Sequence, residues 1–185
     1  MLAEARDFFP DCKAVPEPTR QPTNYAALPA RAARHALSEP GAALLALRMG
    51  AWVVAVTLLL RVLPLPRALR LVAPRRRAGR PRGSEGAAEV QARLARLLDS
   101  VLAANFWVFT PTCWKRAPVL HRYLALSGIE TRVLFGVRPG AAPGDALAGH
   151  AWLEAGGRPL LEPSPPDYKV TYSFPAGEKA AGGSR

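Results

Sequence analysis

Three residues in the second half of the chain could together form a thiol active site. Cys113 follows Thr110-Pro111-Thr112, which is typical of a helix start because threonine caps amide groups and proline is tolerated in the first turn. His150 lies in the apolar segment 149–154, and Glu162 follows it by twelve residues. A cysteine, a histidine and a carboxylate can serve as nucleophile, base and orienting group in covalent catalysis.

The helix predicted after Cys113 would activate its sulfur. Apolar residues recur at helical spacing from Trp114 to Ala125, and Ser127-Gly128 is a typical helix end. The amide groups and positive dipole end of a helix stabilise an anion, so they should lower the pKa of a thiol in the first turn. Pro118 falls inside the helix, removes one backbone hydrogen bond and should kink it.

A small antiparallel sheet is expected after this helix. The first segment is short, rich in β-branched residues and bounded by Gly128 and Pro139. Gly156-Gly157 predicts a hairpin turn, so the strand after it should pair back on the strand before it and bring Glu162 close to His150. The predicted strands are 129–137, 150–155, 158–162 and 168–174.

Other residues compete for the roles of base and orienting group. His121 lies eight residues beyond Cys113 on the same helix, and a rise of about 1.5 Å per residue places it roughly 12 Å away, too far to take the proton. Glu154 shares a strand face with His150 but points beside it, and Asp167 lies beyond a proline-rich turn. Trp152 shares the same face and is interpreted as a core residue.

These motifs resemble the transglutaminase-like cysteine peptidases of lasso-peptide biosynthesis. The resemblance covers roughly residues 41–163 and is carried by three groups of residues: Cys113-Trp114-Lys115-Arg116, residues 128–138, and His150-Ala151-Trp152-Leu153-Glu154. It implies an α+β fold with a papain-like or transglutaminase-like core, in which helices pack on a small antiparallel sheet. The catalytic residues it implies are Cys113, His150 and Glu162, with glutamate in place of the family's usual aspartate.

The resemblance also implies a reaction and partners. The substrate would be a ribosomally made precursor peptide, whose leader is removed through an acyl-enzyme. In this family, leader recognition belongs to a small domain that residues 1–40 do not resemble. A separate leader-recognition protein is therefore implied, together with an ATP-dependent macrolactam synthetase. This chemistry requires no cofactor, and the sequence has no Cys-x-x-Cys or His-x-x-x-His motif for a metal.

Two alternatives remain at this point. The same residues could transfer the acyl group to an amine, as transglutaminases do. Alternatively, the chain could be a non-catalytic, membrane-associated scaffold in which Glu162 and Pro118 mark a decayed site.

The length of 185 residues fits one compact unit with flanking segments. We expect a proline-rich irregular arm over 1–40, with a short helix at 29–37, and an apolar helix followed by a basic linker over 41–84. The peptidase core is expected over 85–175 and a disordered tail over 176–185. Within the core, an amphipathic helix over 85–101 and an aromatic cluster at 105–109 precede Cys113.

The formal net charge of +11 is concentrated after the apolar helix. Twelve uncharged residues, 49–60, are too few against the roughly 20 that span a bilayer, so a buried or interfacial helix is favoured over a transmembrane one. Arginines from Arg61 to Arg82 occur without an acid, so residues 48–82 could contact an anionic membrane surface. The same cluster could bind an acidic leader peptide, and a solvated linker is the other alternative. The lack of interleaved aromatic residues argues against nucleic acid.

The two cysteines, Cys12 and Cys113, lie about a hundred residues apart, and we expect no structural disulfide between them. A catalytic thiol and few cysteines indicate a reducing compartment. The predicted location is therefore cytoplasmic, with peripheral attachment at the inner face of the membrane as an option.

Overall fold

The computed structural model describes residues 40–74, 84–104, 109, 112–139, 147–162 and 165–175. The predicted arm before residue 40, residues 75–83 of the basic linker, the aromatic residues 105–108 and the predicted tail lie outside the described residues.

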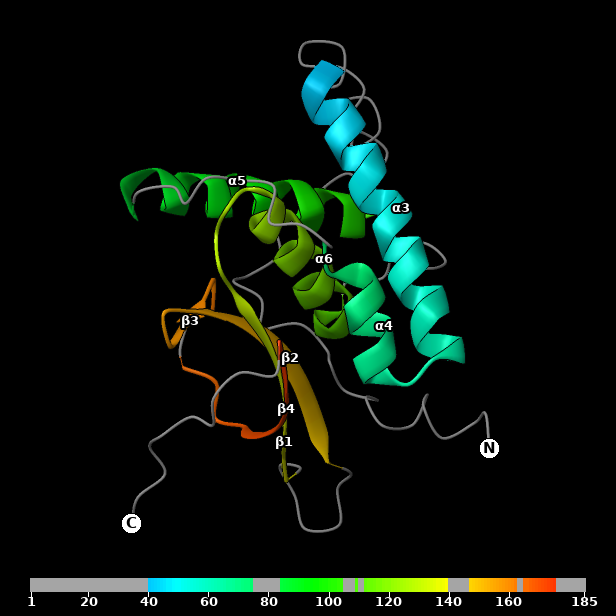
Figure 1. Cartoon of the computed structure of the whole chain (residues 1–185), viewed down its shortest axis with the longest axis vertical. Helices are drawn as coiled ribbons and strands as arrows, with labels where there is room; N and C mark the ends of the chain where they lie inside the picture. Colours follow the sequence, from blue (N-terminus) through cyan, green and yellow to red (C-terminus); the bar gives the residue numbers. More distant parts are fainter. Residues whose placement is uncertain are drawn as a thin grey trace, which may run out of the picture.

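Helices gather at one end of the molecule and strands at the other (Figure 1). The described part of the chain forms helices and one four-stranded sheet, and the predicted α+β class with helices packed on a small antiparallel sheet is confirmed. The elements are α3 (Pro40–Val62), α4 (Leu65–Val72), α5 (Ser84–Leu102), α6 (Cys113–Leu126), β1 (Arg132–Arg138), β2 (Ala148–Ala155), β3 (Arg158–Leu160) and β4 (Lys169–Phe174).

The central element is α6, which contacts α3, α4, α5, β1 and β2. Its buried Leu120 and Leu124 join Met49 and Val53 of α3 and Leu98 of α5 in one hydrophobic core. Burial of each large apolar side chain stabilises the fold by about 1.5–3 kcal/mol, so this core holds the helix that begins at Cys113 in place.

One arginine links three helices. The guanidinium of Arg122 on α6 lies 3.8 Å from the ring centre of Trp52 on α3. Its Nη1 also donates a 2.6 Å hydrogen bond to the carbonyl of Val72, at the end of α4. The region predicted as one apolar helix and a basic linker over 41–84 contains the two helices α3 and α4, because Pro64 disfavours helical geometry in the residue before it.

The end of α6 is a Schellman cap, which explains why the first strand starts later than predicted. Gly128 adopts a φ of 78°, and its N–H donates to the carbonyl of Ala125. The N–H of Ile129 donates to the carbonyl of Leu124, so this residue belongs to the cap. The ladder of β1 therefore begins at Arg132 and not at residue 129.

The sheet is antiparallel with strand order β3-β2-β1-β4. The hairpin predicted at Gly156-Gly157 is confirmed, since both residues have positive φ and β2 pairs with β3. The third strand ends at Leu160, two residues short of the prediction, because Leu161 adopts a φ of 59° and turns the chain out of the ladder. Strand β4 pairs with β1 at the other side of the sheet.

Candidate active site

Helix α6 begins at Cys113, as the sequence predicts, and Thr112 is its extended N-cap residue. The prediction that threonine caps the helix through its side chain is wrong. The Oγ1 of Thr112 is buried and makes no hydrogen bond within the described residues; the Thr112 carbonyl instead accepts N–H groups of Lys115 and Arg116. Pro118 is buried inside α6, and the helix continues past it.

Cys113 packs against the hydrophobic core at the start of α6. In this structure the residue is disulfide-bonded. The only other cysteine of the sequence, Cys12, lies outside the described residues. The prediction that Cys12 and Cys113 form no structural disulfide with each other therefore also falls outside the described residues. Because Cys113 is disulfide-bonded, its sulfur can act as a nucleophile only after the disulfide is reduced.

His150 and Glu162 are brought together as predicted. The Nε2 atom of His150 lies 3.3 Å from Oε2 of Glu162, and their side chains are only 20% and 12% exposed. The carboxylate that accepts this hydrogen bond belongs to Glu162 and not to the rivals Glu154 and Asp167. Strand β2 positions the histidine, and the turn at Leu161 directs the carboxylate back toward it.

Two aromatic rings flank the His150 imidazole. The ring of Trp152 stacks 5.8 Å from it with an angle of 13° between the planes, and the ring of Tyr168 lies 5.2 Å away. Trp152 is both a core residue and a neighbour of the histidine, being 4% exposed. Tyr168 was missed by the sequence reasoning. Only the sheet topology indicates its position: Tyr168 directly precedes β4, and β4 pairs with β1 on the side opposite β2.

Gly136 makes room for these rings. It pairs with His150 in the ladder between β1 and β2. A Cβ atom at this position would lie 2.8 Å from Cβ of Tyr168 and 3.0 Å from the Trp152 ring, closer than van der Waals contact allows. Glycine therefore permits the close packing that fixes the imidazole plane.

Arg116, one turn after Cys113 on α6, was also missed by the sequence reasoning as a neighbour of the site. Its guanidinium forms two hydrogen bonds with Asp99 of α5, at 2.7 and 3.1 Å. Burial alone would lower the pKa of Arg116, but the hydrogen bond and charge of Asp99, together with the nearby charge of Glu162, raise it. A permanent positive charge one turn after Cys113 thus faces the acid that holds His150.

His121 is not part of this site, in agreement with the sequence argument. Its Nδ1 lies 2.9 Å from Oγ1 of Thr131, and its ring meets Phe174 edge-on at 5.8 Å. Burial lowers the pKa of His121 to about 4, so this histidine is neutral near pH 7. Its role is structural, as a buried polar group with a satisfied hydrogen bond.

The His150–Glu162 pair is a histidine held by a carboxylate, an arrangement that can accept and donate protons. Because Glu162 lies against Nε2, Nδ1 is the ring nitrogen open to proton exchange, and a neighbouring carboxylate stabilises a protonated imidazole ring. Within the described residues, no cluster of His, Cys, Asp and Glu side chains could hold a metal ion.

A family model described as the Transglutaminase-like superfamily matches residues 51–173. The chain therefore belongs to the transglutaminase-like superfamily, which includes cysteine peptidases and acyltransferases. The match runs from α3 to β4 and contains Cys113, His150 and Glu162. Comparison with curated proteins and with solved structures gives no match.

Proposed function

We propose that this protein is a cysteine peptidase that removes the leader from a ribosomally synthesised lasso-peptide precursor. The observation that carries the proposal is the 3.3 Å contact between His150 and Glu162, next to the helix that begins at Cys113. Membership of the transglutaminase-like superfamily supports a thiol-based reaction. The lasso-peptide substrate rests on the resemblance of residues 113–116, 128–138 and 150–154 to leader peptidases.

The proposed reaction has two stages and begins from reduced Cys113. The thiolate attacks the scissile carbonyl, and the C–N bond breaks to give a thioester while the imidazolium of His150 protonates the leaving amine. Water then attacks the thioester, His150 accepts its proton, and the C–S bond breaks to regenerate the thiolate. Glu162 stabilises the imidazolium whenever it forms.

The proposed partners follow from the same resemblance. A separate leader-recognition protein presents the precursor, and an ATP-dependent macrolactam synthetase closes the ring after cleavage. The proposed location is the cytoplasm, where the precursor is made and where thiols are kept reduced.

Mass spectrometry of a precursor peptide tests this function. The reduced protein is incubated with the peptide and a leader-binding partner, and wild type is compared with Cys113→Ala and with Cys12→Ala as the matched control. We expect cleavage at one leader–core bond in wild type and Cys12→Ala, and intact peptide in Cys113→Ala. Intact peptide in all three samples, despite demonstrated binding by the partner, would overturn the proposal.

Acyl transfer is the second candidate, because the superfamily contains both reactions. Adding a primary amine to the same incubation distinguishes them. A peptidase gives a product with a new carboxyl end, whereas an acyltransferase gives the amide of the added amine.

A further inference from the structure

The outer face of α3 carries an apolar stripe that the fold leaves uncovered. It consists of Leu44, Leu47, Ala51, Leu58 and Val62, all exposed. Their spacing of three, four and seven residues places them on one side of the helix. Leu47 is 71% and Val62 is 75% exposed. We call these five residues the outer stripe.

The opposite face of α3 already serves the core. Met49, Val53 and Val56 are buried against α5 and α6. Residues 41–62 form one helix in the described part of the chain that is long and apolar enough to cross a membrane, yet only 22% of its most apolar window is buried inside the structure. A helix that is apolar on all sides requires a second apolar environment besides the core.

Positive charge surrounds the outer stripe. Arg48 and Arg61 are exposed and lie at its two borders by helical spacing. Arg67 and Arg70 are exposed on α4, and residues 40–74 contain no aspartate or glutamate. Five more arginines follow between residues 75 and 82 in the sequence. A partner for this face therefore needs an apolar region to cover the outer stripe and negative charges next to it to pair with the arginines.

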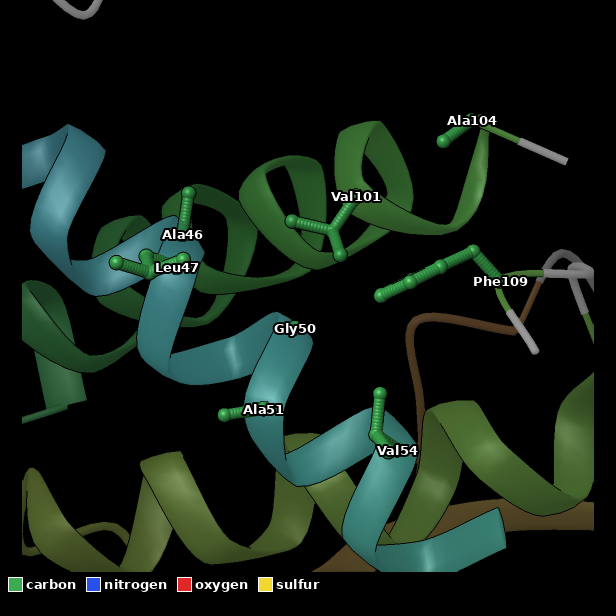
Figure 2. A pocket seen from close by; sticks show the side chains of 8 residues that line it. All are labelled: Ala46, Leu47, Gly50, Ala51, Val54, Val101, Ala104 and Phe109. Atoms are coloured by element: carbon green, nitrogen blue, oxygen red, sulfur yellow. The ribbon is translucent and has the colours of Figure 1, made fainter. Parts of the chain in front are cut away.

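An apolar groove adjoins the outer stripe (Figure 2). It has a volume of about 360 Å³ and lies between α3 and the end of α5. Its lining is almost entirely carbon. Leu47 and Ala51 belong both to this lining and to the outer stripe, so the two apolar surfaces are continuous. The residues that line it include Leu47, Gly50, Ala51, Val54, Val101 and Phe109.

We propose that the outer stripe and its arginines form a surface that lies on an anionic phospholipid membrane. The apolar side chains would enter the boundary between headgroups and acyl chains, and the arginines would contact lipid phosphates. The helix lies in the plane of the membrane and does not cross it, because its other face is part of the core that holds α6. A second copy of the chain fits poorly, since a symmetric contact would bring the same arginines together.

Vesicle flotation of the reduced full chain tests the proposal. We expect flotation with vesicles of equal parts phosphatidylglycerol and phosphatidylcholine, much weaker flotation with phosphatidylcholine alone, and release by high salt. Replacing Arg61, Arg67 and Arg70 with glutamine should weaken partitioning by on the order of a hundredfold, at about 1 kcal/mol per arginine near the surface. The matched control replaces the exposed Arg96, Arg158 and Lys169, which removes the same charge elsewhere and should leave partitioning unchanged.

A second variant tests the apolar part. Leu44, Leu47 and Leu58 are replaced by glutamine, with Val170→Gln as an exposed control on β4, and a thermal melt confirms that the fold is retained. We expect the triple variant to lose flotation by at least about tenfold. Three outcomes would overturn the proposal: equal binding to both vesicle types, equal loss in both arginine variants, or a lipid-independent dimer that the leucine variant dissociates. None of these outcomes depends on peptidase activity.

Discussion

The carboxylate of Glu162 lies against one of the two ring nitrogens of His150, Nε2. In the proposed mechanism, Nδ1 is therefore the nitrogen that exchanges a proton with Cys113. Leu161 turns the chain out of β3 directly before Glu162. The glutamate that stands where the resemblance implies an aspartate thus reaches the imidazole of His150.

Replacing Glu162 with glutamine should keep the shape of the site and remove its charge. The imidazolium then loses its stabilising partner, and we expect the cleavage rate to fall on the order of a hundredfold. Glu154→Gln is the control, because this residue shares the strand face but does not hold His150. Single-turnover cleavage rates measure both, and equal rates in wild type and Glu162→Gln would contradict the assigned role.

His121 should make the fold sensitive to acid. Its pKa is about 4 in the folded protein because of burial, against about 6.5 in an unfolded chain. Between these values the unfolded state binds a proton that the folded state does not. The free energy of unfolding therefore falls as pH drops from about 6.5 to about 4, by up to about 3 kcal/mol.

Urea denaturation at about pH 7 and about pH 4.5 measures this effect. His121→Gln has no proton to gain, so its stability should fall less between the two pH values, while the carboxyl groups titrate alike in both proteins. An identical loss in wild type and variant would show that His121 is not responsible.

At the scale of elements, the site depends on how α6 ends and on how closely the strands pack. The Schellman cap at Gly128 sets the direction in which the chain leaves α6 for β1. Gly136 on β1 then admits the rings that flank His150. Both glycines are required by geometry, one by its φ and the other by the space around it.

Gly128→Ala should destabilise the protein by about 1 kcal/mol, because alanine is strained at a φ of 78°. Gly86 supplies the opposite control. It lies exposed in α5 with nothing close to an added Cβ, so Gly86→Ala should stabilise by about 0.5–1 kcal/mol. Urea denaturation would refute the account of the cap if both substitutions changed stability in the same direction.

Gly136→Ala should affect both stability and reaction. The new methyl group collides with Tyr168 and the buried Trp152, at a cost of about 1–3 kcal/mol. The displaced rings would also tilt His150, so the cleavage rate of the folded fraction should fall. Unchanged stability together with an unchanged rate would show that the strand relaxes without moving the rings.

Across the whole molecule, the sequence predicts the parts that depend on local chemistry. The start of α6 at Cys113, its end before Gly128 and the hairpin that brings Glu162 to His150 follow from the Thr-Pro-Thr helix start, from glycine and from alternation signals. These signals involve only neighbouring residues, so they can be identified in the sequence without knowledge of tertiary contacts.

Features that depend on contacts between distant residues escaped the sequence argument. The hydrogen bonds of Arg116 with Asp99 and the ring contact of Tyr168 with His150 join residues 17 and 18 positions apart and have no periodic pattern. The start of β1 was misplaced because Ile129, which looks like the first residue of a strand, instead completes the cap of α6.

The central claim is that reduced Cys113 is a nucleophile activated by His150. The most direct test is the rate of alkylation by iodoacetamide as a function of pH, in a Cys12→Ser background where Cys113 is the one remaining thiol. An ordinary thiol titrates at about pH 8.5. We expect Cys113 to be alkylated rapidly well below this pH when His150 is present, and only slowly at the same low pH in His150→Ala. The same pH dependence with and without the histidine would contradict the account.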